Sequence, residues 1–272
     1  MIERVAVAIS VYTKDKPEYV KESLDSLYNQ DYKSIDIFLN VDGNISKELR
    51  SLLTEYEEKD NFHIKFFEKN LGLAFQLNDI ISRVFKLGSF SYLARMDADD
   101  VCEPHRITKQ VEYFRNNNNV SVLGTSVIEF GANNKKFYKK MPTSHKDLSD
   151  NIIKRCPFNH PTVMFNLSHL SICDLKYNSE LKNTQDYFLW VDLMSKGYVF
   201  ANLDLPLLRF RVDEKFHSRR GLTKAKNDLL SRFYAMKKLR RHNFLNWFYT
   251  ISLFALRLSP SFLKRIAYNY LR

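Results

Sequence analysis

The chain has 272 residues, of which 44% are apolar and 14% aromatic, and it holds only 7 glycines and 7 prolines. This composition excludes a disordered chain and a collagen-like or other repeat array, and it suits one globular domain with an appendage. The formal charge is +11, yet residues 209–272 carry 16 basic and 3 acidic residues, so residues 1–208 are nearly neutral.

The first 120 residues alternate short apolar runs with longer amphipathic segments. The runs at 4–12, 34–42, 63–68 and 90–96 are predicted strands, and the segments at 17–30, 46–59, 73–88 and 105–116 are predicted helices. Pro17 suits a first helical position, Ser46 a helix cap and Gly88 a helix end. Such alternation predicts a mostly parallel sheet with helices on both faces.

The pattern changes after residue 120. Segments 120–131 and 135–141 resemble a hairpin, 161–165 is a short predicted strand, and 186–197 is a predicted helix. Residues 198–204 and 205–212 are predicted to form two further strands. A parallel half followed by a mixed half predicts one α/β domain.

Polar or acidic residues follow the ends of the four predicted parallel strands. Tyr12 and Asp42 end the first two strands, Asn70 follows the third, and Asp97 and Asp99 follow the fourth. In open α/β sheets, ligands bind in the crevice at the carboxyl ends of the strands. We therefore expect these side chains to line one site.

The stretch YLARMDADDVCEP, residues 92–104, runs from a strand-like segment into a dense acidic cluster. Acidic residues after a strand often only cap the next helix and face water, and a lone Asp-x-Asp is compatible with that interpretation. A helix–loop–helix calcium site is excluded, because the sixth position counted from Asp97 is Cys102 instead of glycine. The string from Asp97 to Val101 also fits the nucleophile motif of haloacid dehalogenase-type phosphatases, although that motif normally ends the first strand of its fold.

Metal binding is the chemical alternative for this cluster. Carboxylates at i and i+2 beyond a buried strand, here Asp97 and Asp99, can hold one hard divalent cation. A bound cation neutralises a diphosphate and makes it a leaving group. Beside a nucleotide at the neighbouring strand ends, such a site is what a sugar-nucleotide-dependent transferase requires.

Six motifs in order carry a resemblance to a known family. They are VAVAISVYTKDKPEYVKESLDSLYNQDY (5–32), VDG (41–43), NLGLAFQLN (70–78), RMDADD (95–100), NHPTVMF (159–165) and QDYFLW (185–190). In these the chain resembles the family 2 glycosyltransferases, which are inverting enzymes of the α/β GT-A fold, a Rossmann-like and mostly parallel central sheet flanked by helices. The resemblance covers residues 4–213 and implies a GT-A catalytic domain over residues 1–215.

The resemblance implies a role for each matched position. Val11 and Tyr12 would line the uracil and ribose of the donor, and Asp42 would hydrogen-bond the base. Asp97 would contact the ribose or the metal, and Asp99 would bind the metal between the donor phosphates. The other implied donor-nucleotide residues are Asn70, Gly72, Asn78, Arg95 and Ala98. A late metal ligand of the family falls on Asp213, with His217 as its alternative.

Asp186 would be the general base by the same resemblance. Thr184 could cap the helix that follows, so Asp186 could instead only favour the helix dipole. As the base, Asp186 would take the proton of the acceptor hydroxyl while that oxygen attacks C1 opposite the diphosphate, giving a β-linkage from an α-linked donor. The preceding residue is Gln185, where many members have Glu.

Acceptor contacts are expected from the two later motifs. Asn159 and His160 would lie on the acceptor side, although a histidine before a proline-led strand is also an ordinary packed residue. Trp190 lies on a predicted helix and could stack on the acceptor or belong to the core, and we favour the core.

Residues 216–272 are predicted to be a basic amphipathic helical region that associates with a membrane. The apolar run FLNWFYTISLFAL, residues 244–256, is shorter than the roughly 20 residues of a spanning helix. Aromatic residues beside Lys and Arg suit an anionic bilayer surface. One alternative is a helical extension packed on the catalytic domain. The other is nucleic-acid binding, but no RNA- or DNA-binding motif accompanies the basic residues.

Together these features predict a metal-dependent inverting transferase using Mn²⁺ or Mg²⁺. It would move galactose, glucose or N-acetylglucosamine from a UDP-sugar to a polyprenyl-diphosphate-linked saccharide during synthesis of a bacterial surface polysaccharide such as O-antigen or capsule. We expect a peripheral protein at the cytoplasmic face of the inner (plasma) membrane, because no secretory leader is recognisable and the three cysteines form no Cys-x-x-Cys pair. The alternatives are a non-catalytic membrane scaffold that keeps the fold and the phosphatase named above.

Overall fold

The first half of the chain builds four parallel strands in the computed structural model, which describes residues 3–131, 136–181, 183–212 and 222–259. The elements in order are β1 (Val5–Tyr12), α1 (Pro17–Tyr28), β2 (Ile35–Asp42), α2 (Lys47–Glu57), β3 (Phe62–Phe67), α3 (Leu73–Leu87) and β4 (Tyr92–Arg95). β1 pairs in parallel with both β2 and β4, and β2 pairs in parallel with β3. The predicted parallel half is confirmed.

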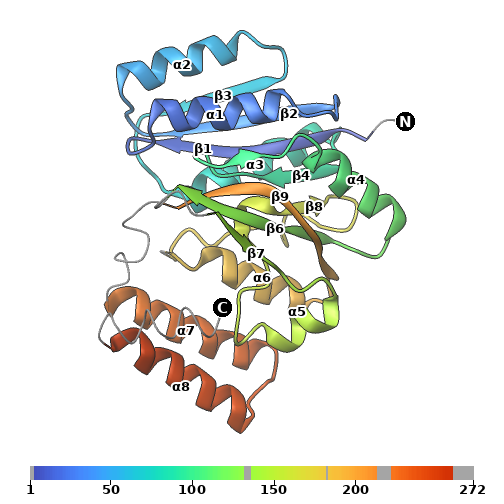
Figure 1. Ribbon diagram of the computed structural model, residues 1–272, viewed down its shortest axis with the longest axis vertical. Helices are drawn as coiled ribbons and strands as arrows, with labels where there is room; N and C mark the ends of the chain where they lie inside the picture. Colours follow the sequence, from blue (N-terminus) through green and yellow to red (C-terminus); the bar gives the residue numbers. More distant parts are fainter. Residues whose placement is uncertain (1–2, 132–135, 182, 213–221, 260–272) are drawn as a thin grey trace.

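The second half adds mixed strands to the same sheet. Its elements are β5 (Val101–Cys102), α4 (Arg106–Asn116), β6 (Val122–Gly131), β7 (Phe137–Lys139), α5 (His145–Asn151), the 3₁₀ helix η2 (His160–Thr162), β8 (Met164–Asn166), α6 (Gln185–Ser195), β9 (Phe200–Val212), α7 (Leu222–Lys238) and α8 (Phe244–Leu258). The strand order is β3-β2-β1-β4-β8-β6-β9-β5, and β7 pairs with β6 (Figure 1). The predicted hairpin is therefore present as β6 and β7.

One prediction about this half is wrong. Residues 198–204 and 205–212 were expected to form separate strands, but β9 is continuous from Phe200 to Val212 and pairs in parallel with β6. Pro206 lies in its middle and cannot donate to the ladder. The sheet accommodates this proline with shifts in register around Ser126 of β6, so the strand bends without ending.

Helices cover both faces of the sheet, and alternation along β1 shows how. Val5, Val7 and Ile9 belong to a core cluster with α1, α2 and α4, whereas Ala6 and Ala8 belong to a second cluster with α3, α5, α6 and α7. Each cluster extends over several strands, and β1 pairs in parallel with both β2 and β4. The carboxyl ends of β1, β2 and β4 therefore meet at one edge.

The start of α2 and the end of α3 follow the predicted signals, and the start of α6 does not. The side chain of Ser46 accepts a hydrogen bond from the main-chain N–H of Leu49 at the start of α2. Gly88 ends α3 in the left-handed conformation, with a φ of 62°. Thr184 occupies the cap position of α6 but makes no side-chain capping bond.

The helices α7 and α8 form a pair at one end of the molecule, with α7 between α8 and α6 (Figure 1). Arg232 of α7 donates to the carbonyl oxygen of Ile152 at 2.8 Å, and Arg241 donates to Ser149. None of the helices in the described parts of the chain is long and apolar enough to cross a membrane.

Candidate active site

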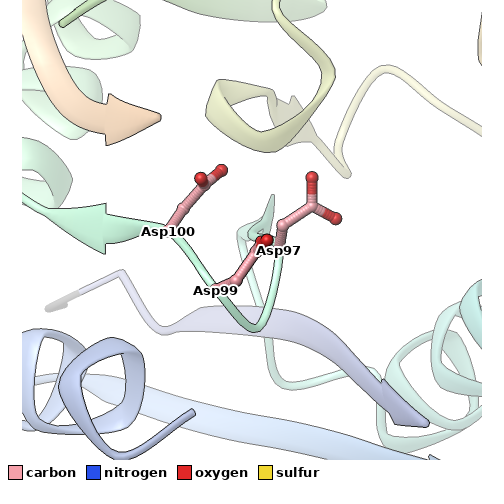
Figure 2. Close-up of side chains that lie close together, drawn as sticks. All are labelled: Asp97, Asp99 and Asp100. Carbon is pink, nitrogen blue, oxygen red and sulfur yellow. The ribbon is translucent and has the colours of Figure 1, made fainter. Parts of the chain in front are cut away.

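The acidic side chains after β4 converge in one tight loop. Ligand atoms of Asp97, Asp99 and Asp100 lie within 4.8 Å of one another, and Figure 2 shows the three carboxylates projecting from the same turn of chain. Asp97 and Asp99 are half-buried. Asp100 is fully buried, and its Oδ2 has no hydrogen-bond partner among the described residues. Carboxylates gathered this closely repel one another until protons or a cation neutralise them.

Burial and the nearby negative charges raise the pKa values of Asp99 and Asp100. Burial, with the charge of Asp97, raises the pKa of Asp99 to about 6. The pKa of Asp100 rises well above its ordinary range, through burial and then through the charges of Asp97 and Asp99. All the donor atoms are carboxylate oxygens, the ligands that Mg²⁺ and other hard cations prefer. The residues present therefore fit a divalent cation.

A fourth carboxylate, from a different part of the chain, lines the same cavity near this cluster. Asp15 lies in the loop after β1 and accepts a hydrogen bond from the main-chain N–H of Tyr12 at 2.9 Å. Burial raises the pKa of Asp15 to about 7, and the charges of Asp99 and Asp97 add to the shift. Sequence reasoning missed Asp15, because only the adjacency of β1 and β4 brings it to the acidic loop.

Arg211 of β9 holds the acidic loop in place. Its Nε donates to the carbonyl oxygen of Asp99 at 2.8 Å, and its main-chain N–H donates to Oδ1 of Asp100 at 2.8 Å. The guanidinium also pairs with Glu22 of α1 and lies 4.0 Å from the ring centre of Tyr19. These contacts join α1, β9 and the loop, so Arg211 is a positioning residue that sequence reasoning had also missed.

Arg95 at the end of β4 lies buried behind the loop. Its Nη2 pairs with Oδ1 of Asp97, and its carbonyl oxygen accepts a hydrogen bond from Nη2 of the buried Arg106 at 2.7 Å. Arg95 is not among the residues that line the cavity. A direct contact between its guanidinium and the donor therefore stays a prediction.

A cavity of about 760 Å³ opens beside the acidic loop. Its walls come from the end of β1, from the end of β2, from the start of α3, from the loop after β4 and from the segment before α6. Among the predicted donor residues, its lining includes Tyr12, Asp42, Asn70, Gly72, Asp97 and Ala98, together with the predicted metal ligand Asp99. The expected convergence of strand ends on one site is present, while the nucleotide contacts themselves stay predictions.

Asp42 organises the wall formed by the start of α3. Its Oδ1 accepts from the main-chain N–H of Leu71 at 2.7 Å and from Nε2 of Gln76 at 2.6 Å, and its Oδ2 accepts from the N–H of Gly72 at 3.0 Å. The next residue must be Gly43, because its φ is 85° and a Cβ there would meet the main-chain nitrogen of Asn70 at 2.9 Å. The carboxylate is thus already engaged by the protein, in addition to the base contact predicted for it.

Asp186 stands at the first turn of α6, next to the cavity-lining residue Gln185. Burial raises the pKa of the Asp186 carboxyl. The N–H of Tyr187 and the charge of Arg95 oppose this rise in pKa, and the charge of Asp97 adds to it. Asp186 is half-buried and is not itself a lining residue. The structure therefore places Asp186 within electrostatic reach of the acidic loop, behind the wall that Gln185 completes.

The residues expected on the acceptor side are mostly packed in the interior. Trp190 is fully buried against Phe158, with ring centres 5.0 Å apart. The possible acceptor contact of Trp190 is therefore wrong, and the favoured prediction that it belongs to the core is confirmed. Asn159 is buried and donates to the carbonyl oxygen of Thr125 at 3.0 Å. A ring nitrogen of His160 bonds Oη of Tyr177 at 2.9 Å.

Two donor-side expectations also need correction. Val11 is fully buried in the core cluster of α1 and α2 and does not line the cavity. Asn78 pairs with the backbone of Tyr177, accepting from its N–H and donating to its carbonyl oxygen, both at 2.8 Å. Asn78 therefore fastens the segment before α6 to α3. Asp213 and His217 lie outside the described residues.

The chain matches the model of glycosyl transferase family 2 over residues 6–171. It is 32% identical over 275 residues to an uncharacterized glycosyltransferase of Haemophilus influenzae, covering 99% of both chains. It is 34% identical over 225 residues to the amylovoran biosynthesis glycosyltransferase AmsE of Erwinia amylovora, covering 82% of each. It is 27% identical over 220 residues to the UDP-Gal:alpha-D-GlcNAc-diphosphoundecaprenol beta-1,3-galactosyltransferase of Escherichia coli, covering 80% of this chain and 78% of that one.

Two solved structures share the fold. TarS residues 1–349 of S. aureus, in complex with UDP-GlcNAc, superposes with a TM-score of 0.68 at 16% identity, covering 93% of this chain and 72% of that one. The mannosyltransferase PcManGT of Pyrobaculum calidifontis, in complex with GDP-Man and Mn²⁺, superposes with a TM-score of 0.64 at 13% identity, covering 99% of this chain and 79% of that one. Both likenesses concern the fold, which is of the GT-A type.

Proposed function

The chain belongs to glycosyl transferase family 2, and we propose that it moves a hexose from a UDP-sugar to a hydroxyl of a lipid-diphosphate-linked saccharide during synthesis of a bacterial surface polysaccharide. The carboxylate cluster of Asp97, Asp99 and Asp100 beside the cavity is the observation that carries this proposal. The relatives named for amylovoran biosynthesis and for a diphosphoundecaprenol-linked acceptor support the substrate class. The UDP-GlcNAc bound by TarS supports a UDP-sugar donor.

The acidic loop would bind the diphosphate end of the donor. The nucleoside would occupy the part of the cavity lined by Tyr12 and Asn70, which leaves the diphosphate beside the loop. Asp97 and Asp99 would hold Mn²⁺ or Mg²⁺, with Asp100 and, outside the described residues, Asp213 or His217 as further donors. When bound, the cation neutralises the diphosphate and makes it a better leaving group.

Asp186 would act as the general base. Its carboxylate would accept the proton of the acceptor hydroxyl while that oxygen attacks C1 of the sugar and the bond to the diphosphate breaks. Attack from the opposite face in a single displacement converts an α-linked donor into a β-linked product. Since the pKa of Asp186 is raised by burial, the carboxylate is a stronger base than an exposed aspartate.

We further propose that residues 1–215 are the catalytic domain and that residues 216–272 associate with the membrane. A lipid-linked acceptor places its reacting hydroxyl close to a bilayer surface. The basic residues concentrated in 209–272 would be attracted to anionic lipids at the cytoplasmic face of the inner membrane. The protein would then be peripheral.

The two alternative functions make different predictions. A non-catalytic scaffold would not need a carboxylate cluster beside a cavity, and the cluster of Asp97, Asp99 and Asp100, with Asp186 within electrostatic reach of it, supports catalysis instead. The phosphatase alternative loses its support, because the motif follows β4 of a family 2 glycosyltransferase instead of a first strand.

A donor panel tests the proposed function. The full chain is incubated with UDP-galactose, UDP-glucose or UDP-N-acetylglucosamine and a short-chain lipid-diphosphate-sugar acceptor, with Mn²⁺ or Mg²⁺. We expect a product one hexose larger than the acceptor with at least one donor, and its loss in EDTA. Inorganic phosphate without any sugar product would contradict the proposal, as would an absence of turnover with every donor.

A further inference from the structure

The outer face of α8 is apolar and exposed. Positions 244, 248, 251, 255 and 258 lie on one stripe of this helix, and the four large side chains there are Phe244, Phe248, Ile251 and Leu258, with exposed fractions of 80%, 63%, 57% and 47%. Leu245 beside the stripe is 70% exposed. Such a continuous exposed apolar surface marks an interaction site in a folded protein.

The most deeply buried positions of α8 are polar, while Leu253, Phe254 and Leu256 are half-buried. Asn246 and Thr250 are the buried side chains of this helix, and Asn246 donates to the carbonyl oxygen of Arg241 at 3.0 Å. Oη of Tyr249 donates to the carbonyl oxygen of Lys154 at 3.2 Å. A surface helix of a soluble domain normally has the reverse arrangement, with its apolar stripe toward the core. The polarity of α8 is therefore suited to an apolar environment outside the protein.

The charged residues from the end of α7 through α8 are all basic. Residues 229–259 contain no Asp or Glu. Lys237, Lys238 and Arg240 are exposed at and just beyond the end of α7, and Lys238 also pairs with Asp192 of α6 at 3.4 Å. The acidic Asp228 of α7 is paired with Arg257 of α8. An apolar stripe flanked by exposed cations complements a bilayer with anionic headgroups better than it complements an acidic or neutral protein surface.

We propose that α8 is the membrane-contacting element of this protein and lies along the surface of an anionic bilayer. The stripe of Phe244, Phe248, Ile251 and Leu258 would enter the boundary between headgroups and acyl chains, and Lys237, Lys238 and Arg240 would contact lipid phosphates. This inference rests on the proposed association of residues 216–272 with the membrane, and it assigns the membrane contact to one face of α8. The helix lies in the interface without spanning it, in agreement with its length of 15 residues.

Vesicle flotation with the full chain tests the stripe. Phe248→Gln and Ile251→Gln together remove the centre of the apolar face and keep a residue with good helix propensity. Leu87→Gln is the matched control, because Leu87 is 59% exposed at the end of α3, and α3 and α8 are well separated in Figure 1. On phosphatidylcholine–phosphatidylglycerol vesicles we expect the double variant to bind on the order of tenfold or more weakly than wild type, and the control to bind normally.

A second variant tests the charges. Lys237→Gln with Lys238→Gln should reduce binding to the anionic vesicles while leaving the weak binding to pure phosphatidylcholine vesicles unchanged. Transfer to a soluble acceptor analogue reports whether each variant is folded and active.

Three outcomes would overturn the inference, and they are distinguishable. If wild type and the stripe variant float equally, the protein binds the membrane, but α8 is not the element that contacts it. If wild type does not float with either vesicle, the proposed membrane association of residues 216–272 is wrong, although transfer to the soluble analogue can persist. If the stripe variant instead converts a dimer into a monomer in light scattering and leaves flotation unchanged, the stripe binds a second copy of the chain.

Discussion

Arg95 and Asp97 form an ion pair in which the guanidinium is buried and the carboxylate faces the cavity, with side-chain exposures of 4% and 34%. The same arginine lowers the pKa of Asp186 against the effect of burial. One buried cation therefore connects the loop proposed to hold the metal with the proposed base. This relationship makes the pH dependence of transfer a probe of the site.

Replacing Arg95 should move the acid limb of the pH–rate profile. The base must be deprotonated to act, so transfer should rise with pH through the raised pKa of Asp186, above the ordinary aspartate value of about 4. Arg95→Gln removes the positive charge that lowers this pKa, and we expect the limb to shift to higher pH. Profiles of kcat from initial rates measure it. An unchanged limb, with transfer intact, would show that Arg95 does not act on the base.

Metal-free protein should lose stability as the pH rises. Asp99 and Asp15, with pKa values of about 6 and about 7, keep protons in the folded state at pH values where the unfolded chain has released them. Because the folded state binds more protons between about pH 4 and 7, these groups lower the free energy of unfolding as the pH rises through that window.

Thermal melts in EDTA and in Mn²⁺ check this expectation. In EDTA, the melting temperature of Asp99→Asn should fall less steeply with rising pH than that of wild type. The comparison with wild type cancels the contributions of other titrating groups. Mn²⁺ should raise the melting temperature of wild type more at about pH 7.5 than at about pH 5, because the ligands must be deprotonated to bind it. Equal effects of Mn²⁺ on wild type and Asp99→Asn would contradict the assigned site.

Arg211→Ala should weaken metal binding through the position of the acidic loop. The variant loses the contacts to Asp99 and Glu22 that hold the loop to β9 and α1. We expect the Mn²⁺ concentration for half-maximal transfer to rise about tenfold, with smaller changes at saturating Mn²⁺. Arg209→Ala is the matched control, since Arg209 lies on the same strand and pairs with Glu103. Equal effects of the two substitutions would show general loosening of β9.

Asp42→Ala should destabilise the fold. The variant leaves the N–H groups of Leu71 and Gly72 and the amide of Gln76 without their acceptor. Each unsatisfied buried group costs about 1–3 kcal/mol, so a loss of roughly 3 kcal/mol in the free energy of unfolding is expected. Urea unfolding measures it, with Asp150→Ala on the surface of α5 as the control. A loss below about 1 kcal/mol would mean that water replaces the carboxylate.

The sequence predicted the parallel half well because alternation, caps and turn residues are local signals. Ser46 and Gly88 end their helices as expected. Features that depend on strand order were not predictable in this way. Asp15 and Arg211 join the acidic loop only through the pairing of β1 with β4 and of β5 with β9. Two strands were predicted where β9 is continuous, and the register shifts by which the sheet accommodates Pro206 are a tertiary effect.

The predicted site residues fall into two groups, those that line the cavity and those whose side chains support the fold. Asp97 and Asp99 stand beside the cavity because they directly follow a strand. Asn78, Asn159 and Trp190 belong to recognisable motifs, but their side chains support the fold: Asn78 bonds the backbone of Tyr177, and Trp190 fills the core. A motif match alone does not separate residues that touch a ligand from residues that hold the wall behind it.

The most direct measurement is the anomeric configuration and rate of product formation by wild type and by Asp186→Asn, followed by NMR with an α-linked UDP-sugar and Mn²⁺. We expect wild type to give a β-linked product, and Asp186→Asn to form it at least about 100-fold more slowly while binding UDP normally. An α-linked product, or undiminished transfer by Asp186→Asn, would contradict a single displacement assisted by this carboxylate.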